Sequence, residues 1–111
     1  MKKIYLATPY SHPDKKVMRE RFEVVNKKAG ELMLEGNVVF SPISHSHPVA
    51  QTMDEKLVCD HELWMKQDMP FLEFCDELWV LHVEGWHLSL GVKTEMARAK
   101  RLKMPIMFVK P

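Results

Sequence analysis

Cysteine is scarce in this sequence, and neither of its two cysteines belongs to a C-x-x-C pair. Such pairs are typical of zinc ribbons and thioredoxin-like redox sites, so neither kind of site is indicated. Long apolar runs are also lacking. The run after Met1 is too short for a signal peptide, and no stretch approaches the ~18 apolar residues of a membrane span. Because two unpatterned cysteines also fit a reducing compartment, we expect a cytoplasmic protein with no membrane contact.

An excess of charge of either sign is missing too. The chain carries 16 Lys and Arg against 15 Asp and Glu, a formal net charge of +1. A basic field strong enough for non-specific binding to nucleic acid is therefore not expected. The length of 111 residues and the 46% hydrophobic composition fit one ordinary globular domain, residues 1–111.

Short apolar runs alternate with segments of helical period along the chain. The first run, Ile4–Ala7, stops at Thr8-Pro9 and is typical of a buried strand. A helix is expected between the polar turn at 11–14 and Gly36, which suits a helix C-terminus. We also predict strands at 38–40, 77–83 and 105–109, a loop at 41–53, and helices at 54–67, 71–75 and 89–102, with a break at Pro70.

This alternating order predicts an α/β fold, a single Rossmann-like (flavodoxin-like) domain whose four-stranded parallel sheet is flanked by helices. Ligands of such sheets bind beyond the carboxyl ends of the strands. Three segments are expected to meet there: Tyr5–Tyr10, Asp68 together with Asp76, and Ser89–Glu95. The substrate-binding candidates that follow the first two strands are Thr8, Tyr10 and His45.

The segment Ser89–Glu95 is the most informative of the three. Ser89 is a good N-cap, and Gly91 allows a ligand to approach the first helical turn closely. The free amides of a helix start attract phosphate, and Glu95 follows within two turns. The spacing alone favours a serine that only caps the helix and a glutamate on the surface.

Sequence motifs add a resemblance to this pattern. The stretch S-L-G-V-K-T-E, with Met96-Ala97-Arg98-Ala99 and Met104-Pro105-Ile106 after it, resembles the signature of the nucleoside 2-deoxyribosyltransferase superfamily. It is most similar to the 2'-deoxynucleoside 5'-monophosphate N-glycosidase branch, which also has Ser-Leu-Gly-Val before the Glu. Tyr5 matches the active-site Tyr of the first strand, and Asp68 matches the catalytic Asp. Residues 41–48 and Gly85-Trp86 resemble an uncharacterised phage and bacterial group of the superfamily.

The resemblance implies a mechanism. Glu95 would attack the anomeric carbon of a deoxynucleoside or its 5'-monophosphate, and a covalent glycosyl-enzyme would form. Asp68 would protonate the leaving base, Tyr5 would orient Glu95, and Ser89 with the next amides would hold the 5'-phosphate. No cofactor is implied. Because members commonly share active sites across subunits, and so short a chain leaves apolar surface uncovered, at least a homodimer is expected.

Two departures from the family pattern leave other functions open. Residues 8–12 replace a Gly-Ser-Ile-Arg-Gly type loop, and the fifth strand and terminal helix common in the family do not follow. A non-catalytic nucleotide-binding or sensor domain of the same fold is therefore the alternative, and a structural homo-oligomer subunit is a third.

The remaining histidines and tryptophans have several interpretations. His61-Glu62 lacks a second His four residues on, so it is not the protease zinc motif, and no metal is expected. Trp86 would stack on a base, pack on the surface or contact a second subunit. Trp64 and Met65 are expected in the core.

Overall fold

Every strand of the sheet runs parallel to its neighbours. The computed structural model describes residues 1–111 and contains one four-stranded sheet in the order β2-β1-β3-β4. This order is that of the flavodoxin-like fold, as predicted. The strands are β1 (Lys3–Ala7), β2 (Val38–Phe40), β3 (Glu77–Leu81) and β4 (Ile106–Val109). The helices are α1 (Lys15–Leu34), α2 (Pro42–Ala50), α3 (Glu55–Val58), α4 (His61–Phe74), the 3-10 turn η1 (Trp86–Leu88) and α5 (Leu90–Arg101).

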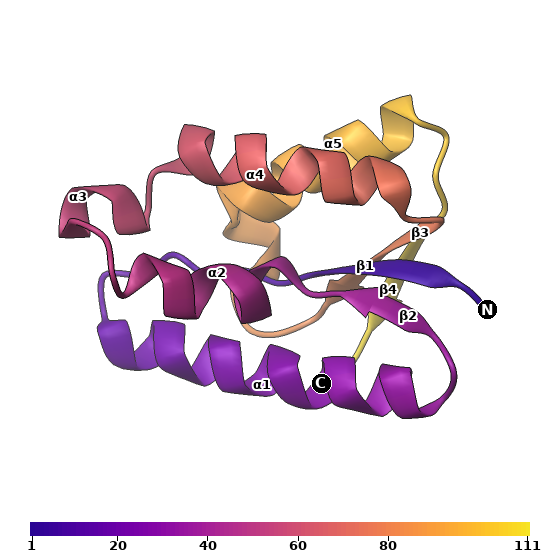
Figure 1. Cartoon of the computed structure of the whole chain (residues 1–111), viewed down its shortest axis with the longest axis horizontal. Coiled ribbons are helices and arrows are strands. Elements are labelled where there is room, and N and C mark those ends of the chain that lie inside the picture. Colours follow the sequence, from indigo (N-terminus) through magenta and orange to yellow (C-terminus); the bar gives the residue numbers. More distant parts are fainter.

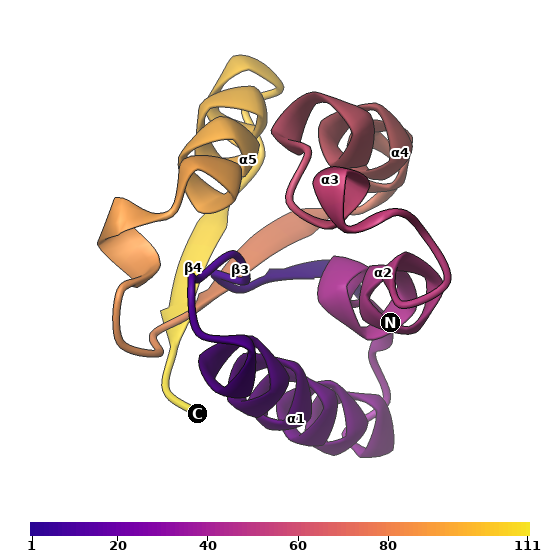
Figure 2. The same cartoon turned by 90° about the vertical axis from the view of Figure 1, so that its left-hand side faces the viewer.

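Helices cover both faces of the sheet (Figures 1 and 2). Because side chains alternate along a strand, β1 supplies both cores: Leu6 packs with Val25 and Ala29 of α1, whereas Tyr5 and Ala7 pack toward the α4 and α5 side. The four residues Ile4–Ala7 are completely buried, as their continuous apolar run predicts. None of the helices is both long and apolar enough to cross a membrane.

Residues 42–50 form helix α2, and our prediction of a loop across this region is wrong. Pro42 occupies the first turn, where its fixed φ suits a helix and no amide hydrogen bond is lost. Pro42, Ser46 and Ala50 are buried at a spacing of four residues, whereas Pro48 is exposed. Burial of one face against α1 and β1 therefore outweighs a composition that is typical of a loop.

Helix α4 runs without interruption through Pro70, so the predicted break there is also wrong. Pro70 and Lys66 both lie on the exposed side of the helix. The Lys66 carbonyl that loses its amide partner can therefore be hydrated, and the opposite side keeps Asp68 and Leu72 buried. One continuous helix is thus compatible with an internal proline.

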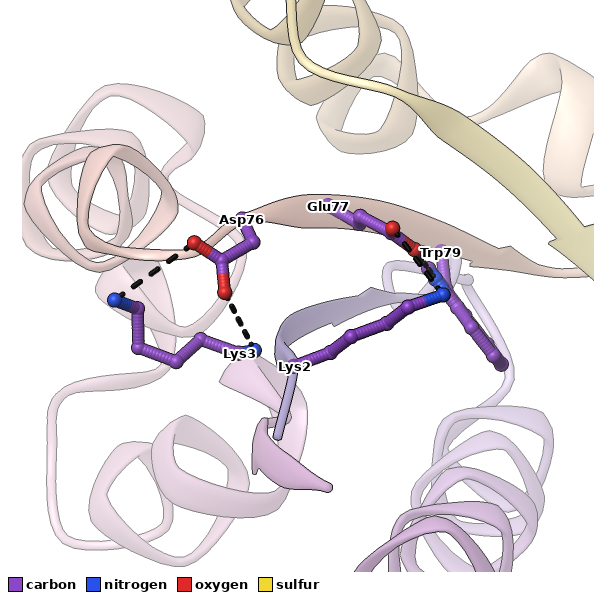
Figure 3. A network of polar contacts seen from close by, with 5 residues as sticks. All are labelled: Lys2, Lys3, Asp76, Glu77 and Trp79. Atoms are coloured by element: carbon purple, nitrogen blue, oxygen red, sulfur yellow. Dashed lines mark hydrogen bonds and ion pairs between the residues drawn. The ribbon is translucent and has the colours of Figure 1, made fainter. Parts of the chain in front are cut away.

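A polar network ties together the amino ends of β1 and β3 (Figure 3). The backbone amide of Lys3 donates to the Asp76 carboxylate at 2.9 Å, and Lys2 pairs with Glu77 at 3.3 Å. The indole of Trp79 donates to the same Glu77 carboxylate at 2.8 Å. Because amino ends and carboxyl ends lie at opposite edges of a parallel sheet, our expectation that Asp76 joins the candidate site is wrong. Its role is to anchor this edge.

Candidate active site

A cleft of about 340 Å³ lies at the carboxyl edge of the sheet. Its walls come from the loop after β1, from α2, from the segment that enters α4, and from the turn that leads into α5. Six of the residues selected from the sequence line it together: Thr8, Tyr10, Asp68, Ser89, Gly91 and Glu95.

Glu95 lies at the inner wall of the cleft, in the second turn of α5, and is 4% exposed. The hydroxyl of Tyr5, which is completely buried on β1, donates a hydrogen bond to its carboxylate. Burial raises the pKa of Glu95 to about 8, while the Tyr5 hydrogen bond acts in the opposite direction because it stabilises the charged form. Burial and the nearby carboxylates raise the pKa of Tyr5 well above 10, so Tyr5 remains a donor.

Asp68 is the second carboxyl group of the cleft. It projects from the inner side of α4, is 5% exposed, and accepts no hydrogen bond from another side chain of the protein. Burial therefore raises the pKa of Asp68 to about 7, since nothing in the chain compensates the charged form for lost hydration. A carboxyl group that holds a proton near neutral pH suits general acid catalysis.

Thr8 follows β1, lines the cleft and has a buried hydroxyl without a hydrogen-bond partner. The residue is 5% exposed, and its Oγ1 atom has no hydrogen-bond partner. A buried polar group without a partner costs about 1–3 kcal/mol. A polar atom of a bound ligand would remove that cost.

The start of α5 forms another wall. Ser89 caps the helix, its Oγ accepting from the amide of Val92 at 3.2 Å. Glu95 is buried, so the interpretation of this glutamate as a surface residue is wrong. A Cβ atom at Gly91 would meet only Ser89 Oγ at 3.8 Å and Met65 Cε at 3.9 Å. Neither the backbone nor the neighbours require glycine there, and its small size leaves the first turn open to a ligand.

Three selected residues do not line the cleft: Tyr5, which lies behind Glu95 and is hydrogen-bonded to it, and Trp86 and His45. Trp86 stacks on His82 at 4.3 Å and lies 5.3 Å from the ring of Phe108, so it packs within an aromatic cluster. His45 is exposed on α2, with its ring 6.4 Å from that of Phe40. The structure therefore separates Trp86 and His45 from the group around Glu95.

One wall of the cleft, formed by the first turns of α4, is not predicted from the sequence. His61, Trp64 and Met65 line the cleft on the same side of the helix as Asp68. Trp64 is partly exposed and its indole donates to the Val58 carbonyl at 2.9 Å, which fixes α3 over the cleft. The expectation that Trp64 and Met65 belong to the core is wrong. Trp64 lies four residues and Met65 three residues before Asp68, and this spacing predicts that all three share one face of the helix.

Tyr10 is held by a side chain from α2. Its hydroxyl lies 2.5 Å from Nδ1 of His47, and that imidazole stacks on Phe22 at 4.2 Å. Burial raises the pKa of Tyr10 to about 12 and lowers the pKa of His47. Both groups are therefore neutral near pH 7, and the direction of their hydrogen bond follows from the tautomer of the imidazole. No group of three or more His, Cys, Asp or Glu side chains lies close enough together to hold a metal ion.

Comparisons with known proteins agree with this fold. The solved structure of a 2-deoxyribosyltransferase from the psychrotolerant bacterium Bacillus psychrosaccharolyticus is similar to the chain, with a TM-score of 0.69 and 23% sequence identity. The similarity covers 98% of this chain and 72% of that chain, and it shows a shared fold. No match was found among curated proteins. A family model described as "Domain of unknown function (DUF1937)" matches residues 2–110. The chain belongs to this DUF1937 family.

Proposed function

We propose that the chain cleaves the N-glycosidic bond of a 2'-deoxynucleoside or its 5'-monophosphate. The observation that carries the proposal is the buried Glu95 carboxylate, bonded to Tyr5, in the same cleft as the raised-pKa carboxyl of Asp68. Enzymes that cleave glycosidic bonds commonly use two carboxyl groups in distinct environments, one as general acid and one as nucleophile or base. The shared fold with a 2-deoxyribosyltransferase supports the substrate class.

In the first step, a Glu95 carboxylate oxygen attacks C1' of the sugar. The bond between C1' and the base nitrogen breaks, and its electron pair leaves with the base. Asp68 gives its proton to the base, because a departing purine or pyrimidine anion is otherwise a poor leaving group. The products are the free base, a glycosyl ester on Glu95 and an ionised Asp68.

In the second step, the ester is broken by a new nucleophile at C1'. Asp68 takes the proton of a water molecule in hydrolysis, or of a second base in transfer. The C1'–Oε bond of the ester breaks and Glu95 leaves as a carboxylate. Both carboxyl groups thus return to their starting states, and the configuration at C1' is retained.

The Tyr5 hydrogen bond stabilises the ionised form of Glu95. Both pKa values are raised by burial, and each negative charge disfavours the other, so the pair tends to share one proton near neutral pH. Only Glu95 receives a donor from the protein. Because the pKa of Glu95, about 8, lies above that of Asp68, about 7, the shared proton resides mainly on Glu95 in the empty cleft, and the first step requires its transfer to Asp68 when the substrate binds.

The start of α5 is assigned to the 5' end of the substrate. Ser89 and the first amides of the helix stabilise a phosphate dianion, and Gly91 leaves space for it. Thr8 supplies a free hydroxyl on the facing wall. Trp64 and Met65 offer apolar surface for the base.

The proposal is tested by incubation with a panel of deoxynucleosides and their 5'-monophosphates, with and without a second free base. Chromatography follows free base and exchanged nucleoside. Glu95→Gln and Asp68→Asn should each abolish release of an ordinary base. Glu62→Gln, the same amide substitution on the exposed side of α4, is the matched control and should keep full activity. Tight nucleotide binding without turnover would instead identify a nucleotide sensor.

A further inference from the structure

Arg21 of α1 bridges two loops at the carboxyl edge of the sheet. Its Nη1 atom donates to the Tyr10 and Ser11 carbonyls at 3.4 and 3.2 Å, and its Nη2 atom donates to the Glu84 carbonyl at 3.2 Å. The guanidinium forms no ion pair within 4 Å, so carbonyl oxygens are its hydrogen-bond partners, and the Glu84 carboxylate stabilises this partly buried charge from a longer distance. The planar donor fork of arginine is suited to such a bridge.

Gly85 makes the close approach of Arg21 possible. It has a φ of +86°, and a Cβ atom there would lie 2.9 Å from Arg21 Nη2. Any larger residue would therefore both strain the backbone and displace the guanidinium. The position of the Arg21 guanidinium therefore depends on glycine at residue 85.

The bridged loops are the two that frame one end of the cleft. Tyr10 and Ser11 line the cleft from the loop after β1. Gly85 leads through η1 into Ser89, which lines the cleft and starts the helix that carries Glu95. A second hollow of about 560 Å³ adjoins the cleft at Ser11 and Ser89, with Arg21 in its wall.

We propose that Arg21 is a positioning residue that fixes the distance between these loops and thereby the shape of the cleft around Ser89. It does not touch the substrate. It holds Ser11 and the start of α5 in place before a ligand arrives, which lowers the cost of ordering them on binding. The effect on ligand affinity rests on the proposed function, whereas the bridge itself does not.

Hydrogen exchange measures the bridge without any ligand. The amides of Trp86, Leu88 and Ser89 are hydrogen-bonded within their own turn and report its opening. Arg21→Gln should speed their exchange about tenfold or more while the amide of Leu78, in the sheet, keeps its rate. Arg19→Gln, on the same helix but paired only with Glu23, should change none of these rates. Unchanged turn amides, or equal acceleration throughout the chain, would overturn the proposal.

Gly85→Ala provides a second test in which Arg21 remains. It should speed exchange of the same amides, and its effect should be smaller in the Arg21→Gln background, where the displaced group is gone. Equal effects in both backgrounds would mean that the two residues act independently, contrary to the bridge.

Ligand affinity is then measured by calorimetry with 2'-deoxyadenosine 5'-monophosphate as the probe, in Glu95→Gln protein so that no turnover occurs. Adding Arg21→Gln should raise Kd about tenfold, and Arg21→Lys should do the same because an ammonium lacks the donor fork. If Arg21→Lys keeps the original Kd, the positive charge matters rather than the donor geometry, and the positioning role is overturned. If Kd is unchanged in both variants, Arg21 has no role in ligand binding. If the probe does not bind Glu95→Gln at all, the assigned substrate fails, and hydrogen exchange alone decides the bridge.

Discussion

The hydroxyl of Tyr5, at the centre of β1, donates a hydrogen bond to the carboxylate of Glu95 on α5, 90 residues further along the chain. The contact is fully buried and joins the central strand to the helix that borders the cleft. It favours the charged form of Glu95 against a burial cost that favours the neutral form. This bond therefore extends toward lower pH the range over which Glu95 can act as a nucleophile.

Tyr5→Phe should shift the acidic limb of the pH profile of kcat/KM upward. The Tyr5 bond lowers the pKa of Glu95, so its loss raises that pKa, and a higher pH is needed to ionise the carboxylate. A hydrogen bond to a charged group contributes about 1.5–3 kcal/mol, which corresponds to about one to two pH units. Phenylalanine keeps the ring contact with Phe40. An acidic limb at the same pH would contradict the assignment of Glu95 as the ionised group.

Asp68→Asn should raise the free energy of unfolding above that of the wild type, and this difference should be larger at pH 8 than at pH 5. Burial raises the pKa of Asp68 from 3.8 to about 7, so the folded state binds a proton that the unfolded state has lost. The wild type is thus fully stabilised by this group below about pH 4 and loses that stability as pH rises through about 7. The variant escapes this loss, about 2–4 kcal/mol in the free energy of unfolding. Denaturant unfolding at both pH values measures it, and a pH-independent difference would contradict the raised pKa.

Thr8→Val should raise stability and lower ligand affinity together. Valine has the same shape and removes a buried hydroxyl without a partner, so the free energy of unfolding should rise by about 1 kcal/mol. The loss of the only polar atom of that side chain should weaken nucleotide binding. Thr52→Val is the control, because its hydroxyl already donates to the Val49 carbonyl at 2.7 Å outside the cleft. Lower stability together with unchanged affinity in Thr8→Val would mean that Thr8 does not face the ligand.

Ser89→Asp tests for a 5'-phosphate at the start of α5. Aspartate is also a good N-cap, so the fold should be preserved, but its charge repels a phosphate dianion. Binding of a deoxynucleoside 5'-monophosphate should weaken tenfold or more, as loss of about 1.5–3 kcal/mol predicts, and binding of the nucleoside should change much less. Calorimetric titration with both ligands separates the effects. Equal wild-type affinity for both would exclude the phosphate site while leaving glycosidic cleavage open.

Much of the fold follows from local sequence signals. The apolar run Ile4–Ala7, the polar turn at 11–14 and the cap at Ser89 predict elements that the structure contains. Helix α2 is missed because its stability comes from tertiary burial of Pro42, Ser46 and Ala50, which composition does not reveal. The uninterrupted α4 is missed because the cost of an internal proline depends on which side of the helix it occupies.

The candidate site is only partly visible in the sequence. Spacing alone favours a surface position for Glu95, whereas the resemblance to a family selects it together with Tyr5 and Asp68. Trp86 is wrongly expected at the cleft because it packs on the nearby His82 and on Phe108 of β4, which only the folded sheet brings together. The Arg21 bridge is invisible in advance, since its acceptors are backbone carbonyls, which every residue possesses.

The covalent ester on Glu95 is the step from which the rest of the mechanism follows. It should accumulate in Asp68→Asn protein given a deoxynucleoside whose base departs without protonation, such as a nitro-substituted heterocycle. The first step then needs no acid, whereas the second step lacks its base. Mass spectrometry of the acid-quenched protein should find one deoxyribosyl group on the peptide that contains Glu95, and none when Glu95→Gln is added. Release of base with no adduct, or an adduct on another residue, would contradict the proposed mechanism.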